Sequence, residues 1–177
     1  KLEPRMLARR ADGVVTRLED DDWTVRRAAL VKLRQVEPLA LAQHAGAIAA
    51  RLEDDDRHVR SAALDLLRML EPPMLAQHAG AIAARLEDDD RFVRSTALST
   101  LSQLQPPTLA QHAGTVVARL EDADRDVRCE ALWALSRLEP PTLAQHAGVI
   151  AARLEDDEDD VPVSYTHLTL PTKWIVG

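Results

Sequence analysis

The chain of 177 residues is 46% hydrophobic but only 3% aromatic, so its core must consist mainly of Leu, Ala, Val and Ile side chains. Its 29 acidic and 22 basic side chains give a formal net charge of −7, and an acidic surface repels the phosphate backbone of nucleic acids. The apolar runs are too short to cross a bilayer, and the single cysteine, Cys129, excludes an internal disulfide framework. We expect a helical intracellular protein, in the cytoplasm or the nucleus, without nucleic-acid or membrane partners.

The strongest signal in the sequence is a block of 34 residues that recurs with little variation. The hexapeptide LAQHAG at Leu41–Gly46 returns at 75–80, 109–114 and 143–148, and a weaker copy begins at Leu7. A fixed period of this length is typical of stacked arrays of small helical units. The array is predicted to span residues 1–161, as a partial repeat 1–6, repeats 7–40, 41–74, 75–108 and 109–142, and a truncated repeat 143–161.

Each repeat is predicted to be a hairpin of two helices. Apolar residues at positions 41, 45, 48 and 52 share one face of a first helix of about a dozen residues. In later copies Thr108 and Gln111 have capping-box spacing, which predicts that this helix begins at Thr108. The acidic run 53–56 is expected to cap a second helix of about fifteen residues. Because one hairpin buries too little apolar surface to fold alone, the hairpins must stack into an all-α solenoid, or superhelix.

The end of the chain departs from the repeat. Pro162 stands where earlier copies have an arginine, and residues 163–177 resemble one reading frame of a transposon-end adapter used to prepare sequencing libraries. We expect residues 162–177 to be a non-native or disordered tail, and the array to be a fragment of a larger protein. The alternative is a genuine tail with β propensity.

The second helix of each repeat carries the pattern Val-Arg, then Ala-Leu, then Leu. It occurs as Val59-Arg60, Ala63-Leu64 and Leu67, and again in the repeats at 93–101 and 127–135. This pattern, preceded by an Asp in the turn between the helices, resembles the HEAT repeat family of armadillo-like α-solenoids. The period is shorter than is usual for HEAT arrays and closer to the compact repeats of bilin-lyase relatives. Tetratricopeptide repeats share the period, but their Trp/Leu/Gly/Tyr pattern is missing.

The resemblance implies a structural ladder in which Asp and Arg side chains of adjacent repeats pair along the turn edge. Its expected members are Asp22, Arg26, Asp56, Arg60, Asp90, Arg94, Asp124 and Arg128.

The resemblance also implies that the polar arc of the second helices lines the concave side of the array. Residues on this arc vary between copies, whereas the apolar columns barely change. Large aromatic side chains on such a surface are typical anchors for a partner. The candidate partner-binding residues are His58, Asp65, Phe92, Ser99, Cys129 and Trp133. The alternative is neutral variation at exposed positions, with Trp133 covering the next repeat.

Other recurring residues are interpreted as structural. The histidines at 44, 78, 112 and 146 should stand about 8–10 Å apart, too far to share a zinc ion. The acidic turns lack the spacing and the central glycine of an EF-hand loop. The glycines at 46, 80, 114 and 148 lie inside predicted helices, which indicates close approach of a neighbouring helix.

These observations predict a protein without catalytic residues, metal or cofactor. The leading hypothesis is a non-catalytic, monomeric scaffold that binds a protein or peptide along its concave face. One alternative is a domain related to bilin lyases that assists chromophore attachment, and another is a structural spacer.

Overall fold

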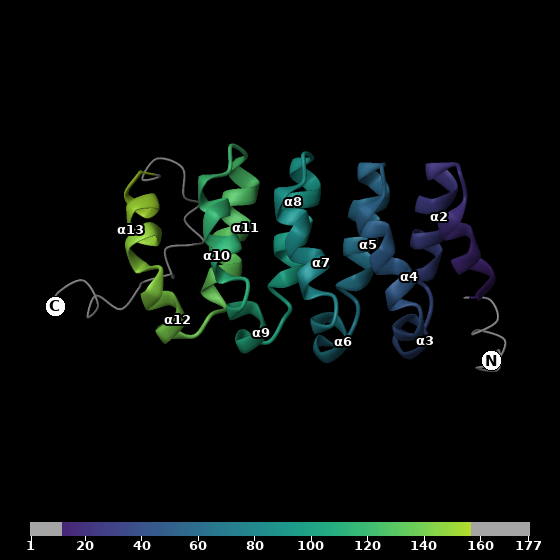
Figure 1. Ribbon diagram of the computed structural model, residues 1–177, viewed down its shortest axis with the longest axis horizontal. Helices are drawn as coiled ribbons and strands as arrows, with labels where there is room; N and C mark the ends of the chain where they lie inside the picture. The colour runs from purple at the N-terminus through teal and green to yellow at the C-terminus, as the bar shows by residue number, and fades with distance from the viewer. Residues whose placement is uncertain (1–11, 157–177) are drawn as a thin grey trace.

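The computed structural model describes residues 12–156 of the chain. The partial repeat 1–6, the end of the array beyond 156 and the tail 162–177 lie outside the described residues. Within residues 12–156 every regular element is a helix, and the helices follow one another in a row from one end of the molecule to the other (Figure 1). The prediction of an all-α solenoid is confirmed.

Each complete repeat contains three helices rather than the two that were predicted. A long helix follows two short ones, and the second short helix of a complete repeat ends in a 3₁₀ turn (η2 to η4). The first described repeat contributes η1 (Thr16–Glu19) and the long helix α2 (Trp23–Leu33). The remaining elements are α3 (Pro38–Gln43), α4 (Ala45–Ala50), η2 (Arg51–Glu53) and α5 (Arg57–Leu67); α6 (Pro72–Ala76), α7 (Ala79–Ala84), η3 (Arg85–Glu87) and α8 (Arg91–Leu101); α9 (Pro106–Ala110), α10 (Ala113–Ala118), η4 (Arg119–Glu121) and α11 (Arg125–Ser136); and α12 (Pro140–Gln145) and α13 (Ala147–Asp156).

The predicted first helix is broken at the recurring histidine. His78 has φ −109° and ψ 4°, outside the helical region, and its N–H donates to the carbonyl of Leu75 at 2.9 Å, three residues back. The next helix then begins, with the N–H of Ile82 donating to the carbonyl of His78 at 3.0 Å. The apolar spacing continues across the break because both short helices pack on the same core. That spacing therefore carried no sign of the break.

The two kinds of helix start in different ways. The short helices α6, α9 and α12 begin at prolines, which have no N–H to satisfy and whose φ is already helical. Thr108 therefore lies inside α9, and the predicted capping box at this residue is wrong. The long helices begin after an aspartate cap: Asp56 accepts hydrogen bonds from the N–H groups of His58 and Val59 at 2.8 and 3.2 Å.

One continuous apolar core runs through the stacked repeats. The long helices α2, α5, α8 and α11 pack directly against one another in that order. The inward-facing residues of α5 and α8 are completely buried: Val59, Ala63, Leu67, Val93, Ala97 and Leu101. The short helices add Leu75 and Ile82 from beneath, and both are fully buried. Each repeat therefore shares its apolar surface with the next, as the prediction of obligatory stacking requires.

The glycines in the short helices face open space. A Cβ atom built on Gly46, Gly80 or Gly114 would meet nothing within 4 Å, and none of the glycines in residues 12–156 has a positive φ. The predicted close approach of a neighbouring helix at these glycines is therefore wrong.

Replacing these glycines by alanine should stabilise the fold. Alanine loses less conformational freedom than glycine in a helix, so Gly80→Ala is expected to raise the free energy of unfolding by up to about 1 kcal/mol. Chemical denaturation of the wild type, Gly80→Ala and the triple variant with Gly46→Ala and Gly114→Ala measures this gain. A loss of stability in the single variant would show that the site is not open.

Candidate partner-binding surface

The turns between the short and the long helices are held by arginines that contact two repeats. Arg26 donates through Nε and Nη2 to the two carboxylate oxygens of Asp54 in the next repeat, at 2.8 and 2.7 Å. Arg94 does the same to Asp122, with both distances 2.8 Å. Arg60 reaches the equivalent Asp88 through Nη2 at 2.7 Å. The described repeats are thus joined by a ladder of arginine–aspartate pairs.

The ladder uses different aspartates from those predicted. Its acidic members are Asp54, Asp88 and Asp122, each two residues before the expected Asp56, Asp90 and Asp124. The expected residues, like Asp22, cap the N-termini of the long helices, so one carboxylate oxygen of each accepts from backbone N–H groups and none of them pairs with a ladder arginine. Asp54 instead follows the 3₁₀ turn with an extended ψ of 146°, and its side chain is almost completely buried against Arg26.

Each ladder arginine also closes the turn of its own repeat. Arg60 donates through Nη1 to the carbonyls of Asp54 and Asp55, both at 3.0 Å. Arg128, the last predicted member, makes the equivalent bonds to the carbonyls of Asp122 and Ala123 at 3.1 and 3.4 Å. The guanidinium group of Arg60 therefore satisfies carbonyls of its own turn and binds the next repeat at the same time.

Two further sets of arginines reinforce this edge, and neither is among the residues predicted from the sequence. The arginines of the 3₁₀ turns donate to a leucine carbonyl of the preceding repeat: Arg51 to Leu18 at 2.7 Å, Arg85 to Leu52 at 3.0 Å and Arg119 to Leu86 at 2.9 Å. The arginines that open α5 and α8 pair with the helix-capping aspartates of the next repeat, Arg57 with Asp90 at 2.8 Å and Arg91 with Asp124 at 2.7 Å. The strict recurrence of these arginines at 34-residue spacing was the available signal.

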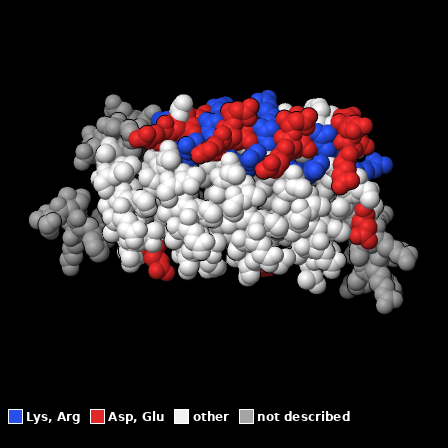
Figure 2. Space-filling view, viewed as in Figure 1, with Lys and Arg blue, Asp and Glu red and all other residues white. Residues whose placement is uncertain are grey.

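The electrostatics of the ladder favour the charged state of its aspartates. Burial alone would raise the pKa of Asp54, Asp88 and Asp122, but the hydrogen bonds from Arg26, Arg60 and Arg94 outweigh it, so the pKa of each carboxyl is lowered. Figure 2 shows the resulting band of acidic and basic residues along one edge of the molecule, above a face that carries little charge. Many of the charged residues along this edge, which the turns form, therefore belong to arginine–aspartate pairs within the protein.

Outward-facing residues of the long helices form the candidate binding surface, which we call the long-helix surface. It comprises positions 24, 58, 92 and 126, positions 27, 61, 95 and 129, and positions 31, 65, 99 and 133. None of these residues is buried, whereas the inward columns of the same helices are. The six candidate residues lie here in pairs: His58 and Asp65 on α5, Phe92 and Ser99 on α8, and Cys129 and Trp133 on α11.

Aromatic side chains on and beside this surface are exposed. Phe92 is 57% exposed and Trp133 is 47% exposed, and the guanidinium of Arg91 lies 4.6 Å from the centre of the Phe92 ring. Trp23, at the start of α2, stacks on His58 of α5 with ring centres 5.5 Å apart. Trp23 was not among the predicted residues, although it stands alone in a column that is otherwise arginine.

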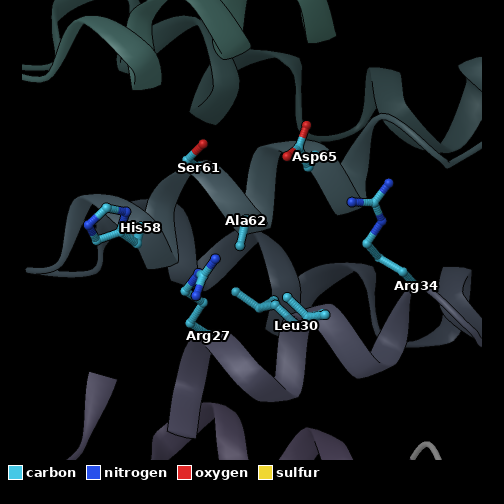
Figure 3. A pocket seen from close by; sticks show the side chains of 8 residues that line it. Arg27, Leu30, Arg34, His58, Ser61, Ala62 and Asp65 are labelled. Carbon is cyan, nitrogen blue, oxygen red and sulfur yellow. The ribbon is translucent and has the colours of Figure 1, made fainter. Parts of the chain in front are cut away.

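A pocket of about 180 Å³ lies between α2 and α5 on this surface (Figure 3). It is lined by Arg27, Leu30, Val31 and Arg34 from the α2 side and by His58, Ser61, Ala62 and Asp65 from α5. Two predicted residues, His58 and Asp65, therefore share one pocket, while the other four lie on later repeats.

The described residues offer no metal site and no membrane span. Within residues 12–156 no three His, Cys, Asp or Glu side chains come together as possible metal ligands. The recurring histidines lie at the breaks between the short helices, one per repeat. No helix in this part of the chain is long and apolar enough to cross a bilayer.

Comparisons with known proteins identify the fold but no family. Neither a protein-family model nor a curated protein matches the chain. A designed armadillo repeat protein solved in complex with the peptide (KR)4 is 18% identical, with a TM-score of 0.68 over 85% of this chain and 75% of that chain. Computationally designed armadillo repeat proteins for modular peptide recognition give 15% identity and a TM-score of 0.66 over 90% of this chain and 85% of that chain. The chain therefore has the fold of an armadillo-like solenoid; at this identity the similarity shows the fold alone.

The ladder predicts unequal effects of two neighbouring arginines. Arg94→Ala leaves the largely buried Asp122 without its bidentate partner, and should lower the free energy of unfolding by about 2–3 kcal/mol. The matched control is Arg91→Ala, because Arg91 is half exposed in its pair with Asp124 and should matter much less. Urea denaturation of both variants tests the difference. Equal losses would contradict the assignment of Arg94 to the ladder.

Proposed function

We propose that this chain is a non-catalytic scaffold that binds a peptide or an extended segment of a partner protein along the long-helix surface. The observation that carries the proposal is a contrast in how strongly equivalent positions vary from one repeat to the next. The Val, Ala and Leu positions of the core and the arginines of the turns recur unchanged, whereas the side chains of the long-helix surface differ between repeats, apart from the shared Ser61 and Ser95. Stacked repeats that differ on this surface present a different side-chain environment at each step of an extended partner.

Exposed aromatic residues support this proposal. Phe92 and Trp133 are large apolar side chains that the core does not need, and aromatic residues of this kind dominate the binding energy at protein interfaces. We propose that the long helices line the concave side of the array. The scaffold would act as a monomer inside the cell, and its origin as a fragment of a longer array remains a prediction.

The proposal predicts that binding depends on these aromatic residues. A display library of random dodecapeptides should yield binders of the full chain, and Phe92→Ala and Trp133→Ala should each weaken them at least about tenfold because each removes a large buried contact. The matched control is Leu39→Ala, since Leu39 in α3 is 81% exposed and lies away from the long helices. Fluorescence anisotropy with the selected peptides measures the affinities.

Two results would contradict the proposal. One is a selection that yields no peptide, and the other is a set of binders weakened by Leu39→Ala but not by the two aromatic substitutions. A shifted, bound absorption spectrum after mixing with a bilin would instead favour the chromophore-attachment alternative.

A further inference from the structure

The pocket between α2 and α5 contains two arginines that the fold does not use. The guanidinium groups of Arg27 and Arg34 make no hydrogen bond or ion pair with any other residue of the described range 12–156. By contrast, the arginines of the ladder are engaged by carboxylates and carbonyls of the turns. Since two unpaired cations are not needed for stability, their charge is available to a ligand.

In later repeats, the residues equivalent to Arg27 and Arg34 do not form a pair of free arginines. The Arg27 column continues as Ser61, Ser95 and Cys129, and the Arg34 column continues as Arg68, Ser102 and Ser136. Arg68 already contacts Asp65 at 3.6 Å and donates to the hydroxyl of Ser99 at 3.3 Å. Within the described repeats, the step from α2 to α5 is therefore the one that combines two free guanidinium groups in a pocket.

The geometry of the pocket suits a negatively charged group on a short aliphatic stem. Arg27 lies in α2 and Arg34, seven positions later, directly follows its last residue, and both project toward α5 (Figure 3). Leu30 and Val31 lie between them and provide an apolar floor, while the hydroxyl of Ser61 adds a neutral donor from α5. The single carboxylate in the pocket, Asp65, is balanced by Arg68. The pocket thus carries a net positive charge on a chain whose formal net charge is −7.

We infer that this pocket seats an acidic side chain, Asp or Glu, of a peptide bound along the long-helix surface; this inference rests on the proposed function. A guanidinium group binds a carboxylate through two parallel N–H donors, and its planar geometry makes the contact selective. The stacked rings of Trp23 and His58 border the same pocket through His58 and provide a flat surface for the adjacent peptide residue. The similar designed protein was instead solved in complex with a basic peptide, (KR)4.

Peptide selection tests the charge preference directly. Random dodecapeptides displayed against the full chain should share Asp or Glu at one fixed position, and alanine at that position should weaken binding about tenfold. Arg27→Ala and Arg34→Ala should each cause a similar loss. The matched control is Arg17→Ala, because Arg17 is an exposed arginine in η1 outside the pocket.

A charge exchange separates a direct contact from a structural effect. Arg27→Glu should abolish binding of the acidic peptide, and lysine at the shared acidic position should restore it. Binders that lack a fixed acidic residue, or that are insensitive to Arg27→Ala and Arg34→Ala, would overturn this inference while leaving the proposed function intact. A selection that yields no binder would overturn both.

Discussion

An arginine in each long helix belongs to two repeats at once. Arg60 binds the turn carbonyls of its own repeat at 3.0 Å and the carboxylate of Asp88 in the next repeat at 2.7 Å. Because these groups are largely buried, a turn whose arginine is lost keeps carbonyls and a carboxylate without partners, which is costly in a low dielectric. Leucine packing provides the non-directional attraction between repeats, and the arginine fixes their separation and orientation.

This division of roles leaves the long-helix surface free to vary. The inward face of α8 is fixed by the core and its first turn is fixed by the charged edge, so the outward position of Phe92 carries neither role, and Ser99 only accepts a hydrogen bond from Arg68. Substitution of Phe92 therefore changes the exposed surface without removing a contact between repeats. A row of long helices with variable outward residues presents a different surface at each step of the array, which is the feature on which the proposed function rests.

Much of this arrangement could be predicted from the sequence, because a pattern that returns in every repeat is less ambiguous than the same pattern seen once. The period, the long helices and their inward columns follow from the recurrence of apolar residues alone. The break at His78 could not be predicted, since the apolar spacing is the same for one continuous helix and for two short ones on a shared core. The ladder aspartates were misplaced by two residues because Asp54, Asp55 and Asp56 are adjacent and chemically identical. Only the backbone decides which one caps a helix and which one faces the next repeat.

The pocket between α2 and α5 was also beyond prediction. It depends on how residues of neighbouring columns meet across two helices, and the period of a repeat says nothing about that lateral contact. His58 was predicted for its variability, but its stacking on Trp23 and its place beside Arg27 required coordinates. Singular residues in otherwise uniform columns, such as Trp23 among arginines, were the usable signal and pointed to the same end of the surface.

The claim that the repeats are coupled through the ladder can be measured by a double-mutant cycle on Arg94 and Asp122. Free energies of unfolding for Arg94→Ala, Asp122→Ala and the double variant give the energy of their interaction across the repeat boundary. A coupling of about 1–2 kcal/mol is expected, because the pair is bidentate and largely shielded from solvent. A coupling below about 0.5 kcal/mol would mean that the two residues act independently and that the ladder does not join the repeats.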